Sequence, residues 1–178
     1  SSDLDHNRTV LTFAGPLAGV EEAAFRAIQK AAELIDLDAH TGEHPRIGAV
    51  DVIPFIPLGD TTIDACVDLA RAFGAHIASR NDIPVYLYAR AAARADRVKL
   101  SDVRRGQYEG LRDEIAQNGR QPDFGPACMH PRFGAVAVGA RPFLIAWNIN
   151  LASDDVELAK RIERAKLADE QMPEVRKA

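Results

Sequence analysis

The residues with the clearest capacity for chemistry lie in one short stretch, residues 42–48, which reads GEHPRIG. It brings an imidazole, a carboxylate and a guanidinium close together on a backbone stiffened by Pro45. An imidazole with a pKa of about 6.5 both accepts and returns protons at neutral pH. His44 is therefore a candidate general acid/base in an active-site loop, and Glu43 is a candidate for orienting it or raising its pKa. The alternative, a histidine that caps a helix or bonds a loop carbonyl, is not decided by spacing alone.

Arginines beside turn residues are candidates for binding the carboxylates of a substrate. Arg46, Arg132 and Arg141 follow or precede glycines and prolines. From such turns a planar guanidinium can pair with a carboxylate through two hydrogen bonds. Arg46 and Arg141 are the carboxylate-binding candidates, although a solvated surface arginine is the alternative for either one.

The histidines and cysteines do not predict a metal site. His40 and His44 have the i, i+4 spacing of zinc-binding helices, but Gly42 and Pro45 oppose a helix there. Cys66 and Cys128 form neither a redox nor a zinc pattern, and we interpret both as reduced thiols. The sequence also lacks the GxSxG elbow of serine hydrolases and the GxxxxGK[ST] phosphate loop. Metal, serine-hydrolase and P-loop chemistry are therefore not expected.

Composition indicates a folded globular domain. The chain has 178 residues, of which 47% are hydrophobic and 27% charged, close to ordinary globular proteins. A net charge of −4 disfavours nonspecific binding to nucleic acid or anionic membranes. The apolar run at residues 143–147 is far shorter than the roughly 20 residues of a membrane helix. The acidic, polar start lacks the pattern of a secretory signal; together with the family resemblance described below, this leads us to expect a cytoplasmic location.

Hydrophobic periodicity predicts strands that alternate with helices around these candidate residues. Strands are predicted over residues 8–15 (buried on both faces), 49–57, 84–89, 135–138 and 143–151. Helices are predicted over residues 20–37, 63–80 and 108–115 and from about 154 onward. Pro54 indicates an edge strand or a bulge, Thr61 or Thr62 is expected to cap the second helix, and Ser153 the last.

The segments between these elements complete the expected arrangement. Residues 38–48 and 118–126 are dense in turn formers and are predicted to be long loops. Residues 90–105 have weak periodicity and are expected to include a flexible surface segment. The last two strands are expected to form a hairpin. The order of elements predicts one α/β (α+β) domain, a mixed β-sheet with helices packed on it.

Three stretches together resemble the N-terminal lobe of the formiminotransferases, the lobe also found in formiminotransferase-cyclodeaminases. They are DHNRTV at residues 5–10, GEHPRIGAVDVIPFIP at 42–57, and PDFGP at 122–126 continuing to GAR at 139–141. Supporting stretches in the same order are VYLY at 85–88, RGQYEGL at 105–111 and FLIAWNINL at 143–151. The resemblance spans most of the chain, and the stretch around His44 is its most specific part.

The resemblance implies a folate-dependent transferase of histidine degradation and one-carbon metabolism. Such an enzyme moves a formimino group between N-formimino-L-glutamate and tetrahydrofolate, its co-substrate, without a metal. The histidine of the Gly-Glu-His-Pro-Arg motif is the family's catalytic acid/base and falls on His44. The family's folate-contacting segment corresponds to Gly125, Pro126, Ala127, Cys128, Met129, His130, Pro131, Arg132, Phe133 and Gly134.

The resemblance also implies a ferredoxin-like lobe that pairs with a similar second lobe, with folate between them, in a homodimer. Relatives carry a further strand and helix upstream, with an acidic residue that assists proton transfer, and a second lobe downstream. Residues 1–178 are therefore expected to be an N-terminal lobe shortened at both ends. Two alternatives stay open: a glutamate formyltransferase of the same family, and a noncatalytic folate-binding or assembly module.

Overall fold

A three-stranded parallel sheet is the centre of the computed structural model, which describes residues 2–144 and 152–162. The strands are β3 (Val52–Phe55), β4 (Val85–Ala89) and β5 (Val136–Ala140), in the order β3-β5-β4. Residues 52 and 85 lie opposite residues 137 and 136 of β5. The chain divides into two compact units, Ser1–Phe143 and Leu144–Ala178, and the sheet belongs to the first.

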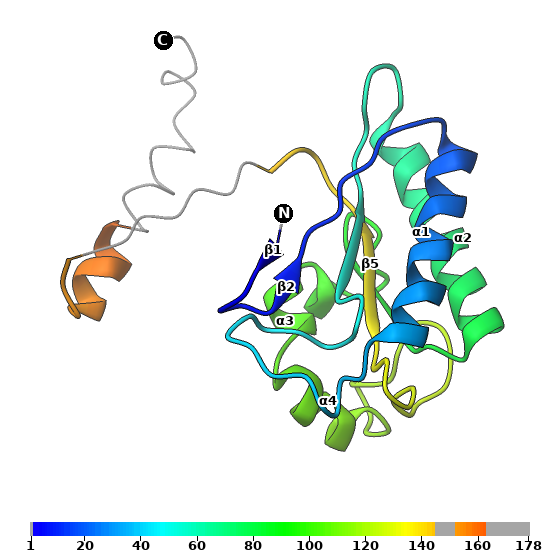
Figure 1. The fold of residues 1–178 in the computed structure, drawn as a ribbon. Helices are drawn as coiled ribbons and strands as arrows, with labels where there is room; N and C mark the ends of the chain where they lie inside the picture. Colours follow the sequence, from blue (N-terminus) through cyan, green and yellow to red (C-terminus); the bar gives the residue numbers. More distant parts are fainter. Residues whose placement is uncertain (1, 145–151, 163–178) are drawn as a thin grey trace, which may run out of the picture. The chain divides into compact units, whose positions relative to one another are not determined.

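Two long helices, α1 (Leu17–Leu34) and α2 (Ile63–Asn81), cover one face of the sheet (Figure 1). Successive side chains of a strand point to opposite faces, and Val85, Leu87, Val136 and Val138 point toward these helices. The Thr62 side chain accepts a hydrogen bond from the Ala65 amide at 3.1 Å, which confirms the cap predicted at Thr61 or Thr62. The buried residues of the helices are Ala24, Ile28, Cys66, Ala70, Phe73, Gly74, Ile77 and Ala78.

The opposite face of the sheet is covered by the short helices α3 (Leu100–Val103) and α4 (Gln107–Glu114) and by loops. Tyr86, Tyr88, Ala135 and Ala137 point to this side and pack with residues of the helices and of the loop before β3. The segment expected to be partly flexible forms η1 (Ala95–Arg97) and α3. All the residues predicted to carry chemistry lie in loops or at element ends.

The prediction of a buried strand over residues 8–15 is wrong. Only β2 (Arg8–Thr9) forms, and it pairs in antiparallel fashion with β1 (Ser2–Asp3). Residues 10–16 are irregular and exposed, with Leu11 72% accessible. Strand preference depends on a partner strand and a surface to pack on, so the alternating pattern of residues 8–15 alone did not determine a strand there.

The other strand and helix predictions have mixed outcomes. The fold class, α/β with helices packed on a sheet, is confirmed, as are strands at 52–55, 85–89 and 136–140; among the described strands, β3 with Pro54 lies at the edge of the sheet. The three described strands of this sheet are parallel, and the antiparallel pairing is in the separate β1–β2 hairpin. Residues 143–144 are not in a strand, and the rest of the predicted hairpin partner, residues 145–151, lies outside the described residues.

In the second unit, residues 156–162 are helical, as predicted. The cap is Asp155, whose Oδ1 accepts a hydrogen bond from the Leu158 amide at 3.0 Å. The Ser153 hydroxyl accepts one from the Asp155 amide at 3.1 Å, so the predicted Ser153 cap is wrong by two residues. Within the described part of the chain, no helix is long and apolar enough to cross a membrane.

Candidate functional site

The loop that carries His44 joins α1 to β3, and its end is fixed to the segment before β5. The Ala49 amide donates to the Phe133 carbonyl at 2.7 Å, and the Ala135 amide donates to the Ile47 carbonyl at 2.9 Å. Gly48 is required here, because a Cβ at this position would collide with the Ala135 carbonyl. The two predicted site segments, residues 42–48 and 125–134, are thus joined by backbone hydrogen bonds.

The β1–β2 hairpin holds the first half of the same loop. The Asn7 side chain donates to the Thr41 carbonyl at 2.7 Å, and the Glu43 amide donates to the Asp5 carbonyl at 3.3 Å. The His6 and His44 rings meet edge to face with 6.4 Å between their centroids. The stretch DHNRTV therefore supports the His44 loop, a role that the sequence analysis missed.

His44 is half-buried, and its surroundings favour the neutral imidazole. Burial lowers the pKa of His44 below its ordinary value of 6.5, and the charges of Arg8 and then Arg104 lower it further. The Asp51 carboxylate and a hydrogen bond with the Pro45 backbone act in the opposite direction. The net direction of the pKa shift is downward, and the carboxylate that opposes it is Asp51. Glu43, predicted to orient His44 or raise its pKa, is not among the groups that shift it.

A largely buried ion pair between Asp51 and Arg104 lies beside His44. The two side chains are 16% and 18% exposed, and Asp51 Oδ1 also accepts a hydrogen bond from the Ile47 amide at 2.9 Å. Asp51 directly precedes β3, and Arg104 directly follows α3. The sequence analysis singled out neither residue; a carboxylate at the start of an apolar strand was the available signal for Asp51.

Arg141 belongs to the same cluster of charges through Tyr88. Burial raises the pKa of Tyr88, while the guanidiniums of Arg141 and Arg104 oppose that rise and Asp51 adds to it. Tyr88 lies in β4 and Arg141 directly follows β5. We call His44, Asp51, Arg104, Tyr88 and Arg141 the His44 cluster.

Arg46 is bound to carboxyl and imidazole groups of the chain itself. Its guanidinium donates to both carboxylate oxygens of Glu109 in α4, at 2.8 and 3.1 Å. It also donates to the His40 ring at 3.3 Å and to the His40 carbonyl at 3.1 Å. The Arg46 side chain is only 12% exposed, so in this structure it clamps the loop to α4.

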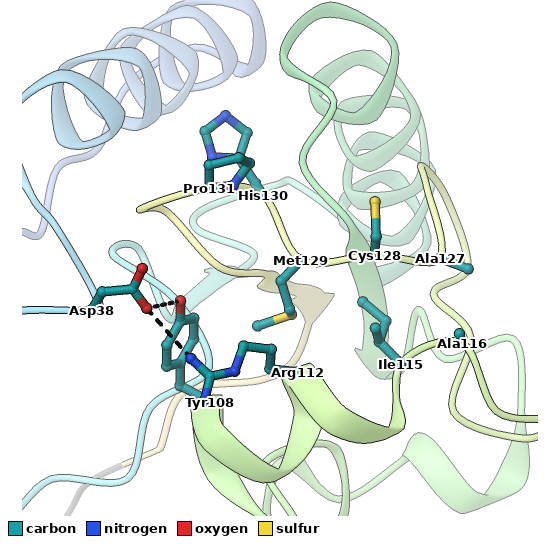
Figure 2. Close-up of a pocket in the computed structure, with 10 residues that line it drawn as sticks. All are labelled: Asp38, Tyr108, Arg112, Ile115, Ala116, Ala127, Cys128, Met129, His130 and Pro131. Atoms are coloured by element: carbon teal, nitrogen blue, oxygen red, sulfur yellow. Dashed lines mark hydrogen bonds and ion pairs between the residues drawn. The ribbon is translucent and has the colours of Figure 1, made fainter.

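Half of the predicted folate segment lines a cavity of about 390 Å³ between α4 and the loop after α1 (Figure 2). On the α4 side, the Tyr108 hydroxyl donates to Asp38 Oδ1 at 2.8 Å, and Arg112 pairs with the same oxygen at 3.5 Å. Figure 2 shows Met129 extending toward Arg112. The cavity therefore has a polar wall opposite a thioether. The predicted residues along it are Ala127, Cys128, Met129, His130 and Pro131.

The glycines at the two ends of residues 125–134 allow backbone conformations that other residues rarely adopt. Gly125 and Gly134 have φ angles of +88° and +82°, and a Cβ at Gly134 would lie 2.5 Å from the Ile47 carbonyl oxygen. Arg132 pairs with Asp36 at 3.2 Å. Phe133 is completely buried in the core next to α1 and α2, so its side chain is not open to the ligand contact predicted for it. Pro126 precedes the cavity-lining residues.

The two cysteines are free thiols, as predicted. Cys66 is a free, buried thiol whose pKa burial raises, and Cys128 is a free, exposed thiol. In residues 2–144 and 152–162, no three His, Cys, Asp or Glu residues are grouped so as to hold a metal ion.

Comparison with known proteins agrees with the resemblance found in the motifs. Residues 1–141 match the family model described as the formiminotransferase domain, N-terminal subdomain. The chain is 49% identical over 165 residues to glutamate formimidoyltransferase of Thermoplasma acidophilum, covering 92% of this chain and 54% of that protein. It is 42% identical over 164 residues to glutamate formimidoyltransferase of Streptococcus pyogenes, covering 92% and 55%.

A larger relative shares the same region. Over 147 residues the chain is 50% identical to formimidoyltransferase-cyclodeaminase of Sus scrofa, which covers 83% of this chain and 27% of that protein. The chain thus spans about half the length of the two glutamate formimidoyltransferases. These matches, together with the His44 loop and its hairpin support, lead to one conclusion: the chain belongs to the formiminotransferase family and corresponds to its N-terminal subdomain.

Proposed function

We propose that this chain takes part in the transfer of a formimino group between N-formimino-L-glutamate and tetrahydrofolate, with His44 as the general acid/base. The observation that carries the proposal is family membership over residues 1–141, combined with a His44 whose surroundings favour the neutral form. Two relatives that match 92% of the chain bear the name glutamate formimidoyltransferase.

The proposed chemistry needs one base that later acts as an acid. The amine nitrogen of tetrahydrofolate attacks the amidine carbon of formimino-glutamate, and a new C–N bond forms in a tetrahedral adduct. The bond from that carbon to the glutamate nitrogen then breaks. His44 takes the proton from the attacking nitrogen and returns it to the glutamate nitrogen as it leaves. The lowered pKa of His44 supplies the neutral imidazole that the first step requires.

The charges around His44 suit a substrate with carboxylates. The guanidiniums of Arg8 and Arg104 act on His44, and that of Arg141 acts on Tyr88 in the same cluster. Of the two predicted carboxylate-binding residues, Arg141 is the stronger candidate because Arg46 is already paired with Glu109. We assign Arg141 to a carboxylate of the glutamate group and keep Arg46 as a support of the loop.

The folate is proposed to bind along residues 125–134, with the cavity beside Met129 and Tyr108 as part of its site. The loop that carries His44 is hydrogen-bonded to this segment, which favours two substrates held near one base. Because the glutamate formimidoyltransferases are about twice as long, we propose that a second lobe completes the groove and that the assembly is a homodimer.

The test is the substitution His44→Gln, made in the chain and in a chimera. In the chimera, this chain replaces the matching segment of the Thermoplasma acidophilum relative, which supplies the remaining half. The transfer rate is expected to fall by about 10²- to 10⁴-fold, the usual contribution of general acid/base catalysis. Product is measured by mass spectrometry, with formimino- and formyl-glutamate as competing donors.

The matched control is His76→Gln, which alters a histidine of α2 on the other face of the sheet. It should leave the rate unchanged. Equal rates for His44→Gln and the parent chimera would refute the assignment of His44. Preference for the formyl donor would identify a formyltransferase, and folinate binding without transfer of either group would identify a noncatalytic binding module.

A further inference from the structure

We propose that the Asp51–Arg104 ion pair is a positioning device for His44, which holds the His44 loop in place and sets the charge that its imidazole experiences. The inference rests on the proposed function only in that a positioned, neutral His44 serves the transfer reaction. Neither Asp51 nor Arg104 is assigned contact with a substrate.

Asp51 uses its side chain and its backbone to fix the loop. Oδ1 accepts a hydrogen bond from the Ile47 amide at 2.9 Å, which closes the turn between the His44 motif and β3. Oδ2 pairs with Arg104. The Asp51 carbonyl accepts a hydrogen bond from the Ala137 amide of β5 at 3.0 Å. Asp51 therefore connects the turn that follows His44 to strand β5 of the sheet.

Arg104 links this turn to the helices on the same face. Its amide donates to the Leu100 carbonyl at 2.9 Å, which anchors its backbone at the end of α3. Both partners of the pair are more than four-fifths buried. A buried carboxylate that loses its cation becomes an uncompensated charge in a poorly solvated place. The pair is therefore expected to hold its geometry when a substrate enters.

The charges that face His44 come from three parts of the fold. Arg8 lies in β2, Arg104 follows α3 and Asp51 precedes β3, while the His6 ring approaches from the β1–β2 turn. Arg104 lowers the pKa of His44 and Asp51 raises it. Loss of Arg104 should therefore raise the pKa of His44 for two reasons: a cation is removed, and the Asp51 carboxylate is left without its partner. Loss of the Asp51 charge should lower the pKa of His44.

The experiment is an NMR titration of the His44 ring in this chain, with the resonance assigned by its disappearance in His44→Gln. Arg104→Met should raise the pKa of His44, and Asp51→Asn, which keeps an oxygen for the Ile47 amide, should lower it. Arg104→Lys retains the cation and should restore a titration close to that of the parent. The control Arg94→Met removes a surface cation paired with Asp96 and should leave the curve unchanged.

Opposite shifts in the two variants support the inference, since mere loosening of the loop would move both curves toward the pKa of an exposed histidine. Superimposable His44 titrations in Arg104→Met and the parent overturn it, and so does a downward shift in Arg104→Met. Asp51→Asn provides an independent test if Arg104→Met does not fold. No substrate is used, so the outcome stands whether or not the transfer assay of His44 succeeds.

Discussion

His44 occupies a half-buried place where its charge depends on residues far from it in the sequence. Its immediate neighbours are bonded elsewhere: the Glu43 amide to the Asp5 carbonyl and the Arg46 guanidinium to Glu109. Arg8, Arg104 and Asp51 act on its imidazole instead. A base whose neutral form is favoured is what the proposed proton transfer between two amines requires.

Cys128 offers a test of the folate segment at the scale of one residue. It is exposed and lines the cavity next to Met129, so alkylation by iodoacetamide should be rapid in the free chain and slower with saturating folinate. Peptide mass spectrometry at timed intervals measures both rates.

Cys66 provides the internal control for this measurement. It is buried, and burial raises the pKa of its thiol, so it should stay unmodified in the native chain with or without folinate. If folinate binds by calorimetry and Cys128 is alkylated at an unchanged rate, the ligand does not cover residues 127–131 and the proposed folate site is wrong.

Among the elements, the short helices next to the His44 cluster depend on a second buried ion pair. Arg97 of η1 binds Asp123 at 2.8 Å, and the two side chains are 6% and 9% exposed. Asp123 also accepts a hydrogen bond from the Leu87 amide of β4 at 2.7 Å, and Arg97 lies over the Tyr86 ring. This pair attaches η1 and the loop before β5 to the central sheet.

Arg97→Met should therefore destabilise the fold strongly. The substitution leaves the Asp123 carboxylate buried without a cation, a change that costs about 3–5 kcal/mol in other proteins. Urea unfolding followed by circular dichroism measures the free energy of unfolding. The neighbouring substitution Arg94→Met breaks only an exposed pair with Asp96 and should leave the midpoint nearly unchanged; similar midpoints for the two variants would show that the Arg97 pair contributes little.

On the scale of the whole molecule, the sheet separates a structural face from a chemical one. The α1 and α2 side carries the larger apolar core, and the opposite side carries α3, α4 and the His44 loop (Figure 1). The cavity beside α4 and the two buried ion pairs belong to that second side. The net charge of −4 does not prevent a local excess of arginine on that second side. Substitutions in the core on the α1 and α2 side are therefore expected to change stability without touching the His44 cluster.

Ile28 tests how firmly α1 is held in the structural face. It is completely buried, whereas Leu34 on the same helix is 69% exposed. Ile28→Ala should lower the free energy of unfolding by about 2–5 kcal/mol through lost burial and a cavity. Leu34→Ala, the matched control, should change it by less than about 0.5 kcal/mol. Thermal and urea unfolding measure both, and an equally small effect of Ile28→Ala would mean that α1 contributes little to the core.

The sequence by itself determined the elements whose signals are local. Helix periodicity located α1, α2 and α4, apolar runs located β3, β4 and β5, and turn chemistry located the long loops. The GEHPRIG motif identified His44 because residue type and the spacing of near neighbours can be read directly from the sequence. The strand predicted over residues 8–15 was wrong beyond β2, because an alternating pattern is local and a strand also depends on tertiary pairing and packing.

Only the tertiary structure decided which distant residues meet. Asp51 and Arg104 are 53 positions apart and Arg46 and Glu109 are 63 apart, so each pair depends on how the chain crosses the sheet. The same holds for the hydrogen bonds between residues 47–49 and 133–135, and for the burial of Phe133 within the predicted folate segment. Charge pairing and burial act through space, and no local pattern encodes the path that brings these groups together.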